Sequence, residues 1–368
     1  MTPIRRYLQF ALFGIIFFSL FFLLNLFVIW SFADLFNIAH DWVFWCIVFI
    51  STIIYPITMV VDLIAHSRWV RVISILGSIW LGVIVESCFI LLLYDGASQF
   101  VHIEKRLAIL ILLTSVTVLS LYSLIASLYI HRRTIELPFS KLSRDLRVVQ
   151  LSDLHLGSTY WLHYLSRVAH IVNSLNPDIV LITGDFADDV SIYQKESLPI
   201  FSLFKAPVFM SLGNHEVYMN SNMKTLAAQV NIAVLKNEVL DRGDYQVIGI
   251  DDGYTAKEIG TLLRQLPYEK SKFTILMHHR PIGFEEASFE GVDLMLSGHT
   301  HQGQLFPFNF LIRLAWKRGK GLYQHGNSFL YVSPGTGTWG PPFRFGSFNE
   351  VTLFLLKAKT SDKKRSRL

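Results

Sequence analysis

Four long apolar runs occupy the first third of the chain and are separated by short polar stretches. Each run is at least twenty residues long, and a helix of that length crosses a hydrocarbon core of roughly 30 Å. None has the polar face that a surface helix of a soluble domain carries. The pattern therefore predicts a transmembrane region over residues 1–130, with spans at about 8–31, 42–64, 72–94 and 107–130.

The first apolar run follows Arg5 and Arg6, as the apolar part of a signal peptide would. It is longer than the roughly 7–15 apolar residues of such a peptide, so we interpret it as an uncleaved span. The third predicted span contains Glu86. A carboxylate inside a membrane is either functional or a paired group that holds helices together.

After residue 146 the pattern changes to short apolar runs that alternate with helical stretches and turns. Residues 179–182 are apolar on both faces of a strand, so layers should cover the sheet on both sides. Between the first two strands, apolar residues recur at helical spacing until Asn176 and Pro177 end the helix. The predicted strands are 147–151, 179–183, 208–212, 246–250, 273–277, 294–297, 329–332 and 351–355.

These patterns predict a domain of the α/β class over residues 146–356, built on a central layered sheet. Residues 131–145 are expected to be a linker, and residues 357–368 a basic tail. The chain is 52% hydrophobic and 17% charged, which excludes a disordered protein. Its two cysteines exclude a disulfide scaffold and a Cys-rich zinc module.

The net charge of +5 is concentrated at the end of the chain. The last twelve residues contain six basic residues and one Asp, which alone gives +5. The rest of the protein is neutral, so a nucleic-acid-binding groove is not expected.

Lys and Arg residues are unevenly divided between the two sides of the predicted membrane region. Nine lie at the N-terminus, in the second loop and after the fourth span, whereas the other side has only Lys105 and Arg106. The positive-inside rule therefore predicts an integral inner or plasma membrane protein with both termini and the α/β domain in the cytoplasm.

Five of the predicted strands are followed directly by Asp, Asn or His. Carboxyl ends of strands form the ligand crevice of open α/β sheets, so these side chains should converge. Carboxylate, imidazole and amide ligands suit Mn, Fe or Zn. With seven or more candidate ligands, two ions about 3.5–4 Å apart would account for the number better than one. The segments are Ser152-Asp153-Leu154-His155, Gly184-Asp185, Gly213-Asn214-His215-Glu216, His278-His279-Arg280-Pro281 and Gly298-His299-Thr300-His301.

The order of these segments resembles that of the calcineurin-like metallophosphoesterases over about residues 146–356. Residues 331–333, 335–337 and 341–346 resemble the membrane-attached bacterial branch of that family. That branch includes general phosphodiesterases and an enzyme that cleaves the pyrophosphate of a lipid A precursor. The resemblance implies a four-layered α/β/β/α sandwich with two facing sheets.

The resemblance also implies two ligand sets with a shared carboxylate. One ion would be held by Asp153, His155, Asp185 and His301, and the second by Asp185, Asn214, His279 and His299. The spacing alone does not decide between the adjacent His278 and His279, but the His-x-Pro pattern favours His279.

In the implied reaction, a hydroxide held between the ions attacks phosphorus. Asp185, Asn214 and His215 would be catalytic, with His215 stabilising or protonating the leaving oxygen. Arg344 would contact the phosphate beside His215. Two positions depart from the family pattern: Gln302 stands where relatives usually have Gly, and Pro334 where the branch commonly has Arg.

The sequence thus favours a membrane-anchored, metal-dependent phosphohydrolase that cleaves a phosphodiester or pyrophosphate bond. Lipid-linked and nucleotide-sugar-lipid substrates are among those expected beside a bilayer. The apolar segment 305–316, with basic residues after it, fits either an interfacial segment or a core-facing strand and loop. The alternative is a membrane signalling or binding protein whose phosphoesterase-like domain docks a partner, and the intact ligand set argues against it.

Overall fold

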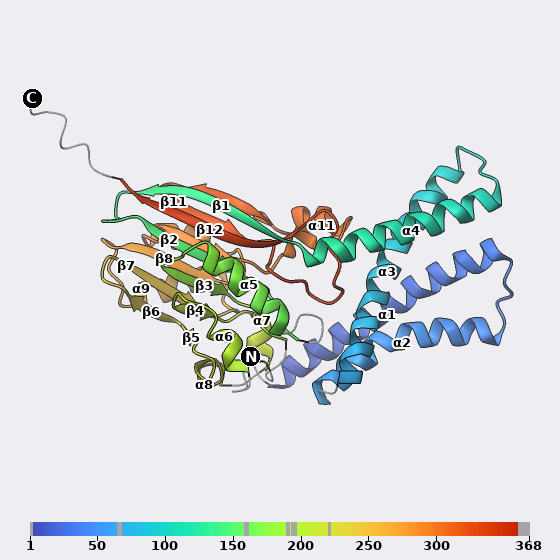
Figure 1. Ribbon diagram of the computed structural model, residues 1–368, viewed down its shortest axis with the longest axis horizontal. Helices are drawn as coiled ribbons and strands as arrows, with labels where there is room; N and C mark the ends of the chain where they lie inside the picture. Colours follow the sequence, from blue (N-terminus) through green and yellow to red (C-terminus); the bar gives the residue numbers. More distant parts are fainter. Residues whose placement is uncertain are drawn as a thin grey trace, which may run out of the picture. The chain divides into compact units, whose positions relative to one another are not determined.

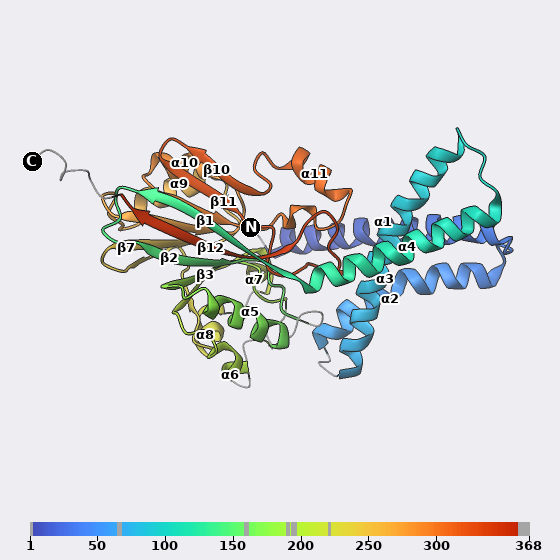
Figure 2. The same cartoon turned by 45° about the horizontal axis from the view of Figure 1, so that its top comes forward.

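The computed structural model describes residues 3–64, 68–157, 162–188, 192, 197–219 and 222–359 (Figures 1 and 2). The chain divides into two compact units. A membrane unit comprises residues 1–125 together with 340–343, and a catalytic unit comprises residues 126–339 together with 344–368.

The membrane unit consists of four long helices, in agreement with the four predicted apolar runs. Each is long and apolar enough to cross a membrane, over Gly14–Phe36, Trp42–Val61, Trp69–Ser98 and Lys105–Leu128. The full helices are α1 (Pro3–Phe36), α2 (Trp42–Ile64), α3 (Arg68–Ser98) and α4 (Lys105–Leu128).

Buried polar side chains connect the helices of this unit. The carboxylate of Glu86 on α3 accepts hydrogen bonds from Ser120 Oγ at 2.9 Å and Ser123 Oγ at 2.5 Å, both on α4. Asn25 Oδ1 on α1 accepts one from Trp80 Nε1 on α3 at 3.1 Å. Of the two roles considered for Glu86, this geometry fits the paired group that holds helices together.

The short segment Gly340–Phe343 folds with these helices. The Phe343 ring is fully buried, and it lies where a side chain at position 82 would be. A Cβ atom added to Gly82 would be 2.8 Å from Phe343 Cδ2. Glycine at position 82 therefore allows the aromatic ring to approach α3 closely.

The catalytic unit contains two six-stranded sheets. The strand order of the first sheet is β1-β12-β2-β3-β4-β5, and that of the second is β10-β11-β9-β8-β7-β6. Their bounds are β1 (Ile130–Phe139), β2 (Leu146–Leu151), β3 (Ile179–Thr183), β4 (Val208–Ser211), β5 (Ala233–Val234), β6 (Glu238–Asp241), β7 (Tyr245–Ile250), β8 (Phe273–His278), β9 (Leu294–Ser297), β10 (Gly321–His325), β11 (Ser328–Val332) and β12 (Asn349–Ala358).

Helices cover the outer faces of both sheets, which gives the four layers that the family resemblance implied. One apolar cluster, with Val148 and Ile275, fills the space between the sheets. A second cluster packs helices such as α5 on the first sheet, and a third packs α9 and α10 on the second. The helices are α5 (Leu162–Ser174), α6 (Leu198–Phe201), α7 (Asn214–Met219), α8 (Met223–Ala228), α9 (Ala256–Gln265), α10 (Phe284–Phe289) and α11 (Phe308–Ala315), with the short 3₁₀ helix η3 (His301–Gly303).

The segment predicted as a linker, 131–145, is largely a strand. β1 pairs in parallel with β12 and is separated from the end of α4 by Tyr129 alone. Ile135, Leu137 and Phe139 alternate inward and are buried, whereas the residues between them are exposed. The basic and acidic residues of the exposed face obscured this alternation in the sequence.

The predicted basic tail also begins later than expected. Lys357 and Ala358 belong to β12, and Lys357 Nζ forms an ion pair with Asp145 at 2.7 Å. The remainder of the predicted tail, residues 360–368, lies outside the described residues.

Candidate metal centre

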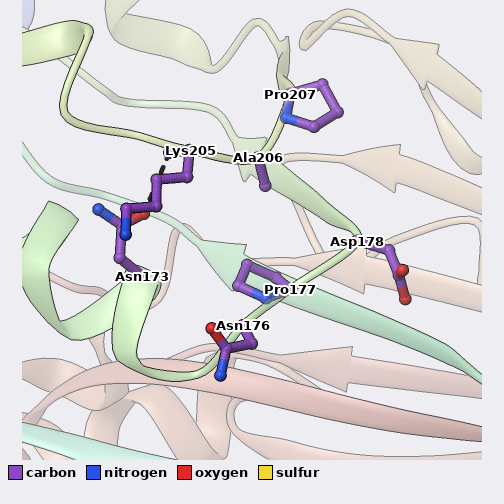
Figure 3. A pocket seen from close by; sticks show the side chains of 7 residues that line it. All are labelled: Asn173, Asn176, Pro177, Asp178, Lys205, Ala206 and Pro207. Carbon is purple, nitrogen blue, oxygen red and sulfur yellow. Dashed lines mark hydrogen bonds between the residues drawn. The ribbon is translucent and has the colours of Figure 1, made fainter.

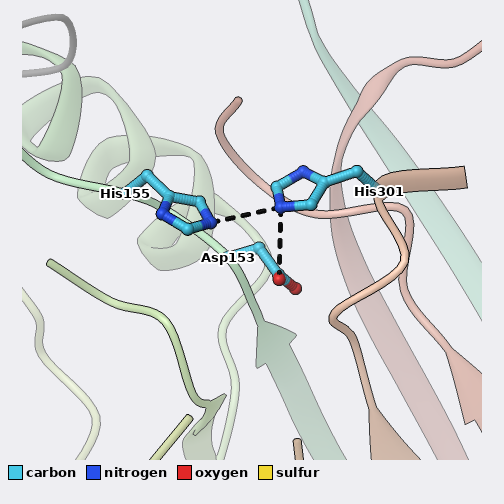
Figure 4. A group of neighbouring side chains, drawn as sticks. All are labelled: Asp153, His155 and His301. Atoms are coloured by element: carbon cyan, nitrogen blue, oxygen red, sulfur yellow. Dashed lines mark hydrogen bonds and ion pairs between the residues drawn. The ribbon is translucent and has the colours of Figure 1, made fainter. Parts of the chain in front are cut away.

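The predicted site residues meet at the carboxyl ends of β2, β3, β4, β8 and β9, which run parallel within their sheets. Figure 4 shows Asp153, His155 and His301 pointing toward one another, the first two from the loop after β2 and His301 from the start of η3. Their ligand atoms all lie within 4.8 Å of one another, and the same holds for two further groups. These further groups are His155 with Asp185 and His215, and Asp185 with His279 and His299.

Two pairs of imidazole nitrogens face each other in this cluster. His155 Nε2 is 3.1 Å from His301 Nε2, and His279 Nε2 is 3.2 Å from His299 Nδ1. Two imidazole lone pairs at this distance repel unless a proton or a cation lies beside them. The donor set therefore fits divalent metal ions.

Asn214, the remaining predicted ligand, lies at the start of α7. Its Oδ1 atom is buried and accepts no hydrogen bond from the described residues. A buried amide oxygen without a donor is costly. This oxygen is thus available as a ligand for a cation beside Asp185, whose Oδ1 accepts a hydrogen bond from the neighbouring His215 backbone N–H at 2.9 Å.

The backbone around the site adopts conformations that are unfavourable for non-glycine residues. Asp153, His155, Asp185, His299 and His301 all have φ between 47° and 73°. Such left-handed positions cost of order 1–3 kcal/mol each and cluster at functional sites. The structure stores this strain in the residues that would contact a metal.

Glycine is required directly before Asn214 and His299 because two carboxylates approach the backbone closely there. A Cβ atom at Gly213 would overlap Asp185 Oδ1, and one at Gly298 would overlap Asp153 Oδ2. No larger residue fits at either position without displacing a carboxylate.

Of the two adjacent histidines, His279 faces the site. Its Nε2 is 3.1 Å from Asp185 Oδ2, and its Nδ1 is 2.8 Å from the carbonyl oxygen of Thr183. An Nδ1–H donated to that carbonyl leaves Nε2 free to bind a cation. His278 instead directs Nδ1 to the carbonyl oxygen of Ile250 at 3.3 Å, and burial lowers its pKa to about 4.

Charges within the cluster compensate one another. Burial alone would raise the pKa of Asp185, but His279 and His215 hold it well below its usual range. Burial opposes protonation of His279, yet Asp185 raises its pKa to about 10. Burial and the nearby His279 lower the pKa of His299 to about 3. A divalent cation can enter such a site by displacing the proton that His279 retains there.

Asp188 orients two histidines, a role that the sequence analysis missed. Its Oδ1 lies 2.8 Å from both His155 Nδ1 and His215 Nδ1. Nδ1–H groups held in this way direct Nε2 of each ring toward the cluster. Burial disfavours the charged form of His215, but Asp188 and Asp185 raise its pKa to about 9.

Glu216 was part of a recognised motif but had no predicted role. Its carboxylate is buried and accepts backbone N–H groups of Asp185 at 2.9 Å, Phe186 at 2.7 Å and Gly213 at 2.9 Å. It thereby fixes the loop after β3 against the loop after β4. The pattern that could have revealed it is a carboxylate two residues after Asn214.

The structure places Arg344, predicted as a phosphate contact, inside the protein. Its side chain is fully buried, and all five N–H donors of the guanidinium are used within the protein. Arg344 therefore holds the His301 loop and the loop around Pro334 in place. The acceptors are Asn349 Oδ1, Ser347 Oγ and the carbonyl oxygens of His301, Pro334 and Gly337.

Aromatic rings surround the cluster. Tyr218 and Trp339, each nearly half exposed, have ring centroids 6.3 and 6.4 Å from that of His215. The Trp316 ring stands edge-on to the ring of His299 at 5.2 Å. The Gln304 amide holds Trp339 by two hydrogen bonds to its backbone, at 3.0 and 3.1 Å. Aromatic side chains at these places offer apolar contact to a substrate.

A separate hollow lies at the opposite ends of β3 and β4 (Figure 3). Several of its polar groups have partners in the protein. Asn173 donates to the Leu203 carbonyl at 2.6 Å and accepts the Lys205 N–H at 3.0 Å, while Asp178 accepts the Arg147 N–H at 2.7 Å. These contacts occupy the Asn173 amide and one carboxylate oxygen of Asp178 in the hollow. Its lining consists of Asn173, Asn176, Pro177, Asp178, Lys205, Ala206 and Pro207.

Comparison with known proteins places residues 146–303 in the calcineurin-like phosphoesterase family model. An uncharacterised metallophosphoesterase of Campylobacter jejuni is 34% identical over 67% of this chain and 69% of its own length. A transmembrane protein with a metallophosphoesterase domain from Bos taurus is 33% identical over 61% of this chain, and the match spans just over half, 56%, of that protein.

Solved structures give more distant similarity. A 5′-nucleotidase precursor from Thermus thermophilus aligns with a TM-score of 0.35 and 12% identity, over 58% of this chain and 55% of that chain.

Proposed function

The chain belongs to the calcineurin-like phosphoesterase family, and on this premise we propose that it uses two divalent metal ions to hydrolyse a phosphodiester or pyrophosphate bond. The proposal rests on two pairs of facing imidazole rings, His155 with His301 and His279 with His299. It also rests on Asp185, which belongs to two of the three close ligand groups. One ion would be held by Asp153, His155, Asp185 and His301. The second would be held by Asp185, Asn214, His279 and His299.

Bound Mn, Fe or Zn ions would make a water molecule more acidic and would neutralise charge on the phosphoryl oxygens. The protein's own residues orient the metal ligands and donate a proton to the leaving oxygen. Asp188 fixes the His215 ring through Nδ1, so Nε2 can donate a proton to the leaving oxygen. Glu216 and Arg344 hold the ligand loops rigid, which keeps the ligands at the spacing that the ions require.

The proposal is tested with the full chain in nanodiscs, first stripped by a chelator and then supplied with Mn²⁺ or Zn²⁺. Bis(p-nitrophenyl) phosphate, p-nitrophenyl phosphate and a lipid-linked pyrophosphate serve as substrates. We expect hydrolysis of the diester or the pyrophosphate to stop on chelation and to return with metal. A stripped protein that rebinds two ions and hydrolyses none of the three would contradict the proposal.

The uneven Lys and Arg distribution supports a cytoplasmic catalytic domain. Cysteines placed at exposed Ser98 and Thr261, after Cys46 and Cys88 have been replaced, should label differently with an impermeant thiol reagent on intact cells. We expect labelling at position 98 and none at 261 until the cells are permeabilised. The reverse result would place the metal centre on the outer side of the membrane.

A further inference from the structure

Helix α11 exposes an unusually large apolar surface for a helix of a folded domain. None of its eight residues is buried. Leu314 is 85% exposed, and Phe310 and Leu311 are also exposed. In Figure 2, α11 stands apart from α9 and α10, the helices that cover the second sheet. Residues 308–315 form a helix with six exposed and two half-buried residues, which favours the interfacial segment over the core-facing strand and loop. An exposed apolar face of this kind marks an interaction site.

The charge around α11 identifies a partner that is anionic as well as apolar. Residues 301–325 contain no Asp or Glu and four Lys or Arg residues: Arg313, Lys317, Arg318 and Lys320. Glu285 pairs with Lys317 at 3.0 Å and with Arg318 at 2.7 Å. Four cations against this one carboxylate leave an excess of three. Aromatic and aliphatic residues on one face, with basic residues beside them, are what an interfacial helix needs on an anionic bilayer.

Backbone hydrogen bonds connect the segment before α11 to Phe345. The Phe306 N–H donates to the Phe345 carbonyl oxygen at 2.9 Å, and the Phe345 N–H donates to that of Gln304 at 3.1 Å. Phe345 lies two residues after the segment Gly340–Phe343, and that segment folds with the long helices of the membrane unit. The segment before α11 is thus hydrogen-bonded to a stretch that directly follows residues 340–343 in the chain.

The other end of α11 leads to the metal centre. Trp316 ends the helix, where its N–H donates to the Ile312 carbonyl oxygen, and its ring contacts the ring of His299. On the other side, η3 precedes α11 in the chain and begins with His301. A phosphoester held at the lipid surface beside α11 would therefore be next to residues of the candidate site.

We propose that the apolar face of α11, formed by Phe310, Leu311 and Leu314, lies in the headgroup region of an anionic bilayer. The metal centre then acts on a phosphoester carried by a lipid of that bilayer. The substrate assignment rests on the proposed phosphohydrolase function, whereas the bilayer contact does not depend on it.

The bilayer contact is tested by an environment-sensitive fluorophore at Leu314→Cys in the full chain lacking Cys46 and Cys88. The protein is placed in phosphatidylglycerol-containing nanodiscs with or without lipids that carry a doxyl quencher near the headgroup. Phe289→Cys is the matched control, because Phe289 is an apolar residue of α10 that is 77% exposed. We expect quenching by the doxyl lipid at position 314, at least about threefold stronger than at 289.

Two results would overturn the bilayer contact. A fluorophore at position 314 that iodide quenches from water, and the doxyl lipid does not, would mean a solvated helix. A fluorophore protected from both quenchers would mean that protein, such as a second copy of this chain, covers the face.

The substrate assignment is tested by the variant Leu311→Asp/Leu314→Asp, since charges on this face oppose insertion into lipid. We expect kcat/KM for a phosphoester lipid in vesicles to fall at least about tenfold, while bis(p-nitrophenyl) phosphate is hydrolysed as before. An equal fall for both substrates would overturn the assignment. If the unmodified chain hydrolyses neither substrate but doxyl quenching at 314 persists, the proposed function fails and the bilayer contact stands.

Discussion

Replacing Asp185 by asparagine should remove both metal ions and nearly all phosphoester hydrolysis. The loss should be on the order of 10³-fold or more, exceeding the roughly 10–100-fold effect of changing a residue that only orients a metal ligand. Asp185 Oδ2 lies 3.1 Å from His279 Nε2 and 3.9 Å from Nε2 of both His155 and His215. A neutral amide of the same size at this central position cannot supply negative charge to two cations.

Metal content by mass spectrometry and the thermal shift on adding Mn²⁺ are the measurements. Ions that bind only the folded state raise its stability, so the unmodified chain should melt at a higher temperature with Mn²⁺ and the variant should not. Asp188→Asn is the matched control: it removes a carboxylate that lies against Nδ1 of His155 and His215, on the side of each ring away from the cluster. That variant should keep two ions. Two ions retained after Asp185→Asn would contradict a bridging role.

The convergence of the candidate metal ligands could be predicted because two sequence patterns coincide. Strands such as Ile179–Thr183 are apolar on both faces and fully buried, so the sequence identifies them without reference to partners. Polar residues that follow directly after such parallel strands must lie together at the carboxyl ends of the strands. The structure brings Asp153, Asp185 and His299 together at that edge.

The direction of individual side chains could not be predicted from these patterns. In the sequence, Arg344 follows a Pro-Pro-Phe segment near a glycine-rich loop. Only the folded chain shows that its guanidinium donates hydrogen bonds to five acceptors inside the protein. Asp188 and Asp189 are equivalent in the sequence. The hydrogen bonds to His155 and His215 distinguish Asp188 as the orienting residue.

Strand β1 was missed for a different reason. Its inward residues are apolar, but Arg132, Arg133 and Pro138 interrupt the run and are typical of a polar connection. Pairing with β12 supplies the hydrogen bonds and the buried face that a single strand lacks. The stabilising partner strand lies more than two hundred positions away in the sequence. The local pattern of residues around β1 therefore gives no sign of it.

Replacing His215 by glutamine should separate proton donation from metal binding. His215 is held by Asp188 through Nδ1, and its Nε2 is 3.9 Å from Asp185 Oδ2, so the ring borders the candidate ligands without belonging to either proposed ligand set. We expect both ions to remain. Hydrolysis of alkyl phosphodiesters should fall about 10²–10⁴-fold, because the alkoxide leaving group needs a proton in the transition state.

Nitrophenyl diesters should lose much less rate with the same variant, because nitrophenolate leaves as a stable anion and needs little protonation. Glutamine at His163, an exposed histidine on α5, is the matched control and should change neither rate. Comparing kcat/KM for the two leaving groups at equal metal content isolates the proton transfer from any change in ligand geometry. If both substrates lost rate equally, His215 would act on the charge of the phosphoryl group or on the shape of the site, and the leaving oxygen would take its proton from water.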